Sequence, residues 1–198
     1  MRLLSTAGLL LGATMSFGLV ACGSSGTSDV TDITSAAMTG GDIPSGFQLN
    51  SAGTADSWSA YSSPTLAKFG VTGGCTSSTT PALEKSSFQH GLGQTALDAN
   101  GYGIKMCAEI LNSDDNAKTI YQDGLNKSSK APASLVSGAK SVSDESFAAV
   151  VHESGITGRV YGFRHANTLI EVEAITKSDN VSTDELYTIA NNIDGRLK

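Results

Sequence analysis

The chain has 198 residues, a formal net charge of −6 and 39% hydrophobic residues. This acidic balance argues against nucleic acid as a partner, because nucleic-acid recognition needs a basic surface. The lysines and arginines are scattered singly along the chain, so the sequence offers no polybasic patch to an anionic membrane.

Residues 1–21 have the layout of a secretory signal peptide. Arg2 supplies one positive charge, and an uncharged run of apolar and small residues follows it as far as Ala21. The run is about 19 residues long, which on length alone also permits an uncleaved transmembrane helix. Its interspersed glycines, serines and threonines, and the polar residues that begin directly after Cys22, favour a cleaved signal.

The four residues Leu19-Val20-Ala21-Cys22 resemble the lipobox of bacterial lipoproteins. The resemblance implies that the Cys22 thiol receives a diacylglyceryl group, that the signal is removed before it, and that the new amino terminus is acylated. Two or three acyl chains anchor a protein stably, whereas one chain binds only marginally. We therefore expect a lipid anchor in the cell membrane, on its extracytoplasmic side, with the lipid bilayer as a partner. The alternative is an ordinary secretory signal followed by an unmodified cysteine.

Residues 22–41 predict a flexible tether between this anchor and a folded domain. They are rich in Gly, Ser, Thr and Asp and contain few large apolar side chains, a composition typical of disorder. As a Gly/Ser-rich coil the stretch would span roughly 22–26 Å. The alternative is a loop of the domain itself. Residues 42–198 fit a single domain.

Two cysteines remain once Cys22 is assigned to lipid. An even pair in an exported chain predicts one structural disulfide, here between Cys75 and Cys107. Two free buried thiols, or a redox pair, are the alternatives. The sequence has no Cys-x-x-Cys motif and no cluster of His and Cys, so it indicates neither a metal site nor a cofactor.

The first half of the domain predicts only short elements: a strand within 44–50, a helix within 63–70 and a strand within 86–93. Residues 101–111 alternate much more regularly. One face is apolar, and the other carries Lys105, Cys107 and Glu109. This pattern predicts a strand with Cys107 on the face away from the apolar stripe. Cys75 is then expected on a loop that covers this second face.

The second half predicts a helix, three strands and a final helix. Ser113 or Asp114 can cap the first helix, and Pro132 lies beyond its end. Short turns separate strands predicted at 145–154, 159–165 and 168–176, so these strands form an antiparallel meander. The last helix, within 182–198, opens with a capping box of Ser182 and Glu185. Together these elements predict an α+β fold, an antiparallel sheet with helices packed on one face.

A second resemblance covers the C-terminal half. Residues 96–111, the Val-Ser-Asp-Glu-Ser turn at 142–146, the hairpin at 162–174 and the closing helix resemble small actinobacterial lipoproteins and the extracellular sensor domains of some actinobacterial serine/threonine kinases. The hairpin carries an aromatic-Arg-x-x-Asn signature, here Phe163, Arg164 and Asn167. The resemblance implies a noncatalytic module that binds a small ligand, a lipid or an envelope protein. Asn at a hairpin turn also tolerates a left-handed backbone, which by itself would explain Asn167.

The alternative function is a small hydrolase or metal-dependent enzyme. His152 and His165 lie on strands that are expected to pair, and Glu171 and Glu173 share one face of the next strand. A His/Glu site could form there, but these residues are equally typical of the polar face of a half-exposed sheet. The sequence has neither a Gly-x-Ser-x-Gly nor a His-Glu-x-x-His motif, so we assign no catalytic residue and predict a noncatalytic, membrane-anchored binding protein.

Overall fold

The structure is a computed structural model that describes residues 29–67, 75–76, 81–129, 133–153, 156–176 and 180–197. The predicted signal peptide and the predicted lipidation of Cys22 lie outside the described residues.

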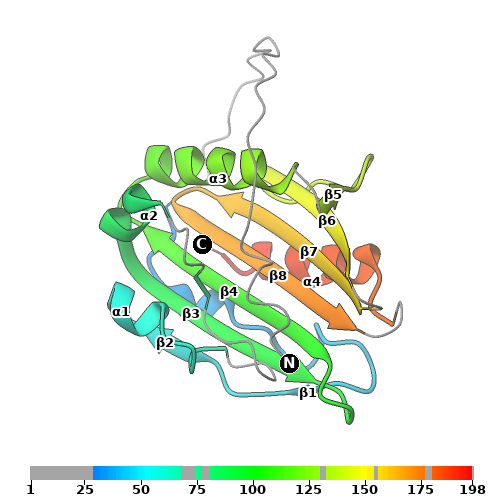
Figure 1. Cartoon of the computed structure of the whole chain (residues 1–198). Coiled ribbons are helices and arrows are strands. Elements are labelled where there is room, and N and C mark those ends of the chain that lie inside the picture. The colour runs from blue at the N-terminus through cyan, green and yellow to red at the C-terminus, as the bar shows by residue number, and fades with distance from the viewer. Residues whose placement is uncertain are drawn as a thin grey trace.

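Within the described residues, one antiparallel sheet has the strand order β1–β3–β4–β8–β7–β6–β5, and β2 also pairs with β3 (Figure 1). The strands are β1 (Gln48–Leu49), β2 (Gly53–Ala55), β3 (Phe88–Leu97), β4 (Gly103–Leu111), β5 (Ala133–Leu135), β6 (Glu145–Glu153), β7 (Ile156–His165) and β8 (Thr168–Thr176). The helices are the 3₁₀ turn η1 (Ile33–Ala36), α1 (Trp58–Tyr61), α2 (Ala82–Ser87), α3 (Asp114–Ser128) and α4 (Thr183–Asp194).

The long elements lie close to their predicted positions. Strands β4, β6, β7 and β8 and helices α3 and α4 correspond to the predicted elements, and β6, β7 and β8 form the expected meander. The prediction did not include the pairing of β8 with β4, which joins the meander to the β3–β4 hairpin. The helix predicted within 63–70 is wrong over 63–67, which form turns, and the short helix α1 precedes them.

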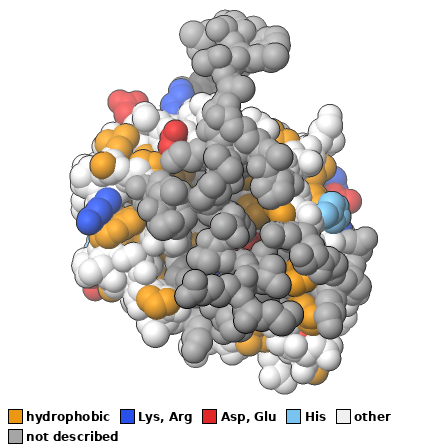
Figure 2. Space-filling view, in the orientation of Figure 1, with side chains coloured by type: hydrophobic (Ala, Val, Ile, Leu, Met, Phe, Trp, Pro, Cys, Tyr) orange, Lys and Arg blue, Asp and Glu red, His pale blue; other side chains and the backbone are white. Residues whose placement is uncertain are grey.

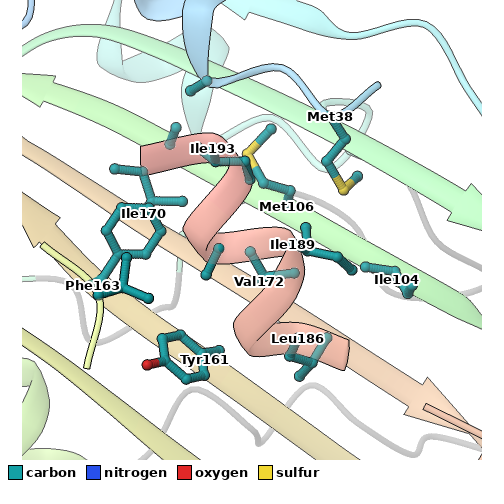
Figure 3. Close-up of a cluster of buried hydrophobic side chains, with 14 of the residues drawn as sticks. Met38, Ile104, Met106, Tyr161, Phe163, Ile170, Val172, Leu186, Ile189 and Ile193 are labelled. Carbon is teal, nitrogen blue, oxygen red and sulfur yellow. The ribbon is translucent and has the colours of Figure 1, made fainter. Parts of the chain in front are cut away.

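The main core lies between the sheet and α4 (Figure 3). The capping box of Ser182 and Glu185 is present at the start of α4, and its stripe of Leu186, Ile189 and Ile193 is almost fully buried. On the sheet, alternate residues of the three central strands face α4, namely Ile104, Met106, Tyr161, Phe163, Ile170 and Val172. We call this side of the sheet the core face and the other side the second face.

The α+β class, the antiparallel sheet and the disulfide are confirmed. Figure 1 shows α4 behind the sheet, in agreement with the predicted packing of helices on one face. Helix α3 adds to this picture, because it packs Ala117 and Ile120 against Leu111 and Leu169 at one end of the second face. Helices therefore contact both faces of the sheet.

The tether prediction is wrong at its C-terminal end. Residues 29–47, which we call the N-terminal strap, pack against the core face beside α4. Val30, Ile33, Ala36 and Met38 are each at most 7% exposed, so the folded domain begins near residue 30 and not at residue 42. The four side chains are sparse in the sequence but all face the sheet, and this burial offsets the entropy of ordering the strap.

Polar side chains of the domain fasten the strap at three points. Asn167 bonds both backbone groups of Val30, and the buried amide of Gln94 bonds both backbone groups of Met38. Further along the strap, Asp42 accepts hydrogen bonds from Arg196 and from the Asn192 side chain of α4. The strap is therefore an integral layer of the domain.

Candidate functional site

Charged side chains gather on the second face, where β4 and β8 pair. Lys105 lies opposite Glu173, and Cys107 lies opposite Glu171. Glu109 is one step further along the same face of β4 and therefore diagonal to Glu171. Figure 2 views the molecule from this side and shows apolar, acidic and basic side chains interspersed around its margin. We call Glu84, Glu109 and Glu171 the carboxyl cluster.

Lys105 is already paired. Its Nζ lies 2.7 Å from Oε2 of Glu173, and both side chains are largely shielded from solvent. Burial opposes the charge on Lys105, but the carboxylates of Glu173 and Glu171 outweigh this effect and raise the pKa of the lysine above its usual value. The lysine therefore stays charged and neutralises one carboxylate of this face.

Glu109 is in a very different position. Glu109 is 6% exposed. Among the described residues, no donor lies within hydrogen-bond distance of its Oε2 atom. Burial is the main cause that raises its pKa well above the ordinary 4.5, and the negative charges of Glu84 and Glu171 raise it further. Glu109 therefore favours the protonated, neutral form.

Glu171 completes the cluster from β8. Glu171 is an exposed residue, yet nearby protein desolvates its carboxyl group and so raises its pKa. The charge of Glu173 raises the pKa further, whereas Lys105 lowers it. Glu171 thus provides an exposed carboxyl group diagonal to the buried Glu109 on the same face of the sheet.

An aromatic cluster borders Glu109 on the other side. The Tyr61 ring lies on Gly91, whose register partner on β4 is Glu109. A Cβ atom at Gly91 would lie 2.3 Å from the ring, so only glycine permits this approach. Phe88 stacks on Tyr61 with centroids 5.0 Å apart, and Trp58 contacts both rings. The ring of Tyr61 is therefore held beside the carboxyl cluster.

The predicted disulfide is present next to this cluster. Cys75 and Cys107 are bonded, with Cα atoms 5.5 Å apart. Gly93 lies opposite Cys107 on β3, and a Cβ atom there would lie 3.1 Å from the sulfur of Cys75. Cys75 thus lies over the second face, as the alternation of 101–111 predicts.

The alternative His/Glu site is not assembled. His152 lies opposite Thr157 at one end of β7, and His165 is at the other end of the same strand. Eight residues of extended chain separate these ends by roughly 27 Å. Residues 165 and 168 pair on the core face, whereas Glu171 and Glu173 face the other way. These four residues therefore form no common site.

His165 does form a small polar group with Ser143 and Asp194. Its Nδ1 atom lies 2.9 Å from the Ser143 hydroxyl and 2.6 Å from the Asp194 carboxylate. In a catalytic Ser-His-Asp relay the serine and the carboxylate contact opposite ring nitrogens, so this arrangement lacks that geometry. Burial raises the pKa of Asp194, but hydrogen bonds from His165 and Ser143 outweigh it and hold that pKa below the usual value. The group joins the 142–146 turn to the end of α4.

The Arg-x-x-Asn signature serves the fold. Arg164, 7% exposed, donates to Glu145 at 2.8 Å, contacts Asp114 at the start of α3, and lies 3.4 Å from Asp144. It therefore connects the 142–146 turn, the β7–β8 hairpin and α3. The positive φ angle at the hairpin turn belongs to Ala166, at 46°, and not to Asn167, so the backbone explanation for Asn167 is wrong. Asn167 is instead used to bond the strap.

Two further observations concern the described residues as a whole. No group of three or more His, Cys, Asp or Glu side chains among them is arranged to hold a metal ion. None of the described helices is long and apolar enough to cross a bilayer.

Sequence reasoning placed Glu109 on the second face but did not identify it as a site residue, and it missed Tyr61 and Glu84. The sequence did contain a signal. Glu109 is the single acidic residue in the apolar last part of the predicted strand, two positions after the disulfide cysteine Cys107. The approach of Tyr61 from a segment almost 50 residues earlier had no local signal.

Comparison with known proteins shows the fold. A solved structure of the extracellular domain of PknH from Mycobacterium tuberculosis matches with a TM-score of 0.59 and 11% sequence identity, over 86% of this chain and 98% of that one. At this identity the match demonstrates a shared architecture. No protein-family profile and no curated protein matches the chain.

Proposed function

We propose that the protein is a noncatalytic binding module, held by lipid on Cys22 at the extracytoplasmic side of the cell membrane. The observation that supports this proposal most directly is the likeness of its fold, over most of the chain, to an extracellular domain. The Leu-Val-Ala-Cys sequence supports the anchor, and a disulfide fits an oxidising compartment.

In the proposed arrangement only a short segment separates the lipid from the folded domain. Cys22 precedes Val30, the first buried residue of the strap, by eight positions. Eight residues span at most about 28 Å even when fully extended. Val30 is bonded to Asn167 in the β7–β8 turn, close to the end of β4 at Leu111. This end of the sheet is therefore the end that faces the bilayer in the proposed arrangement.

Lipidation is tested by replacing the proposed attachment site. The Cys22→Ser variant is expected to leave the membrane fraction after carbonate washing, and Ser25→Ala serves as a control that keeps the thiol. Intact-mass measurement of the purified wild-type protein is expected to show a chain that begins at Cys22 and carries acyl groups. A mature chain that begins elsewhere, or a Cys22→Ser variant that stays bound, contradicts the anchor.

Orientation is tested separately with spin labels on two exposed residues. Asp115 lies in the first turn of α3, at the proposed membrane end, and Asn100 lies in the β3–β4 turn at the other end. The nine residues of β4 separate these ends by about 27 Å. A paramagnetic lipid in the bilayer is expected to broaden a label at 115 more than one at 100. Equal broadening contradicts the orientation without touching the lipidation result.

A further inference from the structure

The end of the sheet where the strap enters the domain is also the end where β3 begins. Asn167 bonds Val30 of the strap and the carbonyl group of Leu111. Leu111 pairs with Phe88, the first residue of β3. Because neighbouring strands are about 4.8 Å apart, Phe88 lies about 10 Å, or two strand spacings, from the strap's first attachment.

Two short helices meet at Phe88 and leave apolar side chains in contact with solvent. The ring of Trp58 in α1 lies 5.6 Å from the ring of Phe88, centroid to centroid, and both residues are half-buried. Helix α2 ends directly before Phe88, and its Leu83 is 38% exposed. Figure 1 shows α1 and α2 together at this end of the sheet. We call Trp58, Leu83 and Phe88 the apolar end patch.

The segment that precedes the strap limits how far this patch can be from a bilayer that holds Cys22. Cys22 precedes Val30 by eight positions. A flexible coil of this length would have a root-mean-square span of roughly 14–17 Å. A short flexible tether gives the tethered group a local concentration in the millimolar range. A patch too small to bring a free protein to a membrane can therefore stay in contact with one when it is tethered.

The side chains of the patch suit the boundary between lipid headgroups and acyl chains. Tryptophan is enriched at this boundary because its ring is apolar and its N–H group is polar, and a leucine side chain gains by leaving water. Asp56 and Asp115 are exposed at the same end of the domain. Because these carboxylates repel anionic headgroups, a zwitterionic surface fits this end better than an anionic one.

We propose that the apolar end patch lies in the interfacial region of a zwitterionic bilayer, as a second contact beside the acyl chains on Cys22. The ring of Trp58 and the side chain of Leu83 enter this region from α1 and α2. The inference rests on the proposed lipid anchor, which supplies the high local concentration. The anchor does not depend on the inference in return, because an acylated chain can hold the domain clear of the surface.

Trp58 is the only tryptophan of the chain, so its fluorescence reports this contact directly. The full acylated protein is reconstituted into phosphatidylcholine vesicles with and without bromine atoms on the acyl chains, since bromine quenches tryptophan at close range. Brominated lipid is expected to quench Trp58, and plain lipid is expected to shift its emission to shorter wavelength than in the Cys22→Ser protein. At the same lipid concentration Cys22→Ser is expected to show neither effect, because its patch is not tethered.

Two variants assign the contact to the patch. Leu83→Glu places a charge on an exposed position of α2 and is expected to remove most of the quenching, while the acylated chain stays in the membrane fraction. Leu135→Glu makes the same change at the other exposed leucine among the described residues, which lies on the edge strand β5, and should leave the quenching unchanged. Equal urea midpoints of the two variants are the check that both are folded.

Three results overturn the proposal and leave the anchor standing. The first is an acylated wild-type protein whose Trp58 is not quenched by brominated phosphatidylcholine. The second is equal quenching in the wild type and in a folded Leu83→Glu variant. The third is stronger quenching in brominated phosphatidylglycerol, which would assign the contact to anionic headgroups. A purified chain without acyl groups contradicts the anchor instead, and intact-mass measurement distinguishes this failure from the other three.

Discussion

The side chain of Asn167 connects three segments that are far apart in the sequence, so its removal gives a sharp test of the fold. Its Oδ1 atom accepts a hydrogen bond from the backbone N–H of Val30 at 2.8 Å. Its Nδ2 atom donates to the carbonyl groups of Val30, at 3.3 Å, and of Leu111, at 3.2 Å. Asn167 is 7% exposed and Val30 is 1% exposed, so water does not replace these bonds easily.

Asn167→Ala is expected to lower the free energy of unfolding by about 2–4 kcal/mol. The substitution leaves the buried N–H and C=O groups of Val30 without their partner, and each such group costs about 1–3 kcal/mol. Asn167→Asp should be at least as harmful, because it keeps the acceptor but directs a carboxylate oxygen at two carbonyl oxygens. A purely steric role for Asn167 predicts the opposite order, since Asp is nearly isosteric with Asn.

Urea unfolding followed by the fluorescence of Trp58, the only tryptophan of the chain, measures the loss. Asn100→Ala, at an exposed position of the β3–β4 turn, is the matched control. Hydrogen exchange in residues 29–38 should increase in Asn167→Ala more than exchange in α4, because the strap loses its first attachment. A loss below about 1 kcal/mol, less than one unsatisfied buried group, or no selective increase in exchange at the strap, would refute this reasoning.

Three further predictions concern the second face. Replacing both Cys75 and Cys107 by Ser should cost about 3.7 kcal/mol in the chain-entropy description of a loop with a sequence separation of 32; a denaturation midpoint equal to that of the oxidised protein contradicts it. Gly91→Ala should lower stability by about 1–3 kcal/mol, because the new methyl group displaces the Tyr61 ring; an unshifted thermal melt would mean that the ring moves at no cost. Because the pKa of Glu109 is raised in the folded state, its contribution to stability is complete below about pH 4.5 and is lost as the pH rises towards the folded-state pKa. As the pH rises above about 4.5, Glu109→Gln should therefore become more stable relative to wild type. Parallel pH profiles of the two proteins would contradict the raised pKa.

Alternation within a strand proved to be the most reliable local signal. Residues 101–111 separate an apolar face from one with Lys105, Cys107 and Glu109, and the structure has the same division in β4. Because side chains of a strand alternate strictly between its two faces, the position of the disulfide on the second face followed from the sequence. The capping box at Ser182 was equally local and is also present.

The N-terminal strap shows where local reasoning fails. Its composition is typical of a disordered segment, and only four residues, Val30, Ile33, Ala36 and Met38, are deeply buried apolar side chains. Their burial depends on a surface that β3, β4 and α4 provide only after folding. Met38 is not part of a strand, and the side-chain amide of Gln94 bonds its backbone N–H and C=O groups instead. None of these partners is close in sequence, so composition alone could not identify the strap as part of the domain.

Arg164 and Asn167, the residues on which the sequence resemblance rests, both make their polar contacts within the fold. Arg164 is surrounded by the carboxylates of Asp114, Asp144 and Glu145, and Asn167 is bonded to the strap. In this chain the Arg-x-x-Asn hairpin is therefore used by the fold, and it carries no information about a ligand. Ligand choice in such a fold must come from side chains that the architecture does not need. In this chain Glu109 is one such side chain, because its buried Oε2 atom has no hydrogen-bond partner among the described residues.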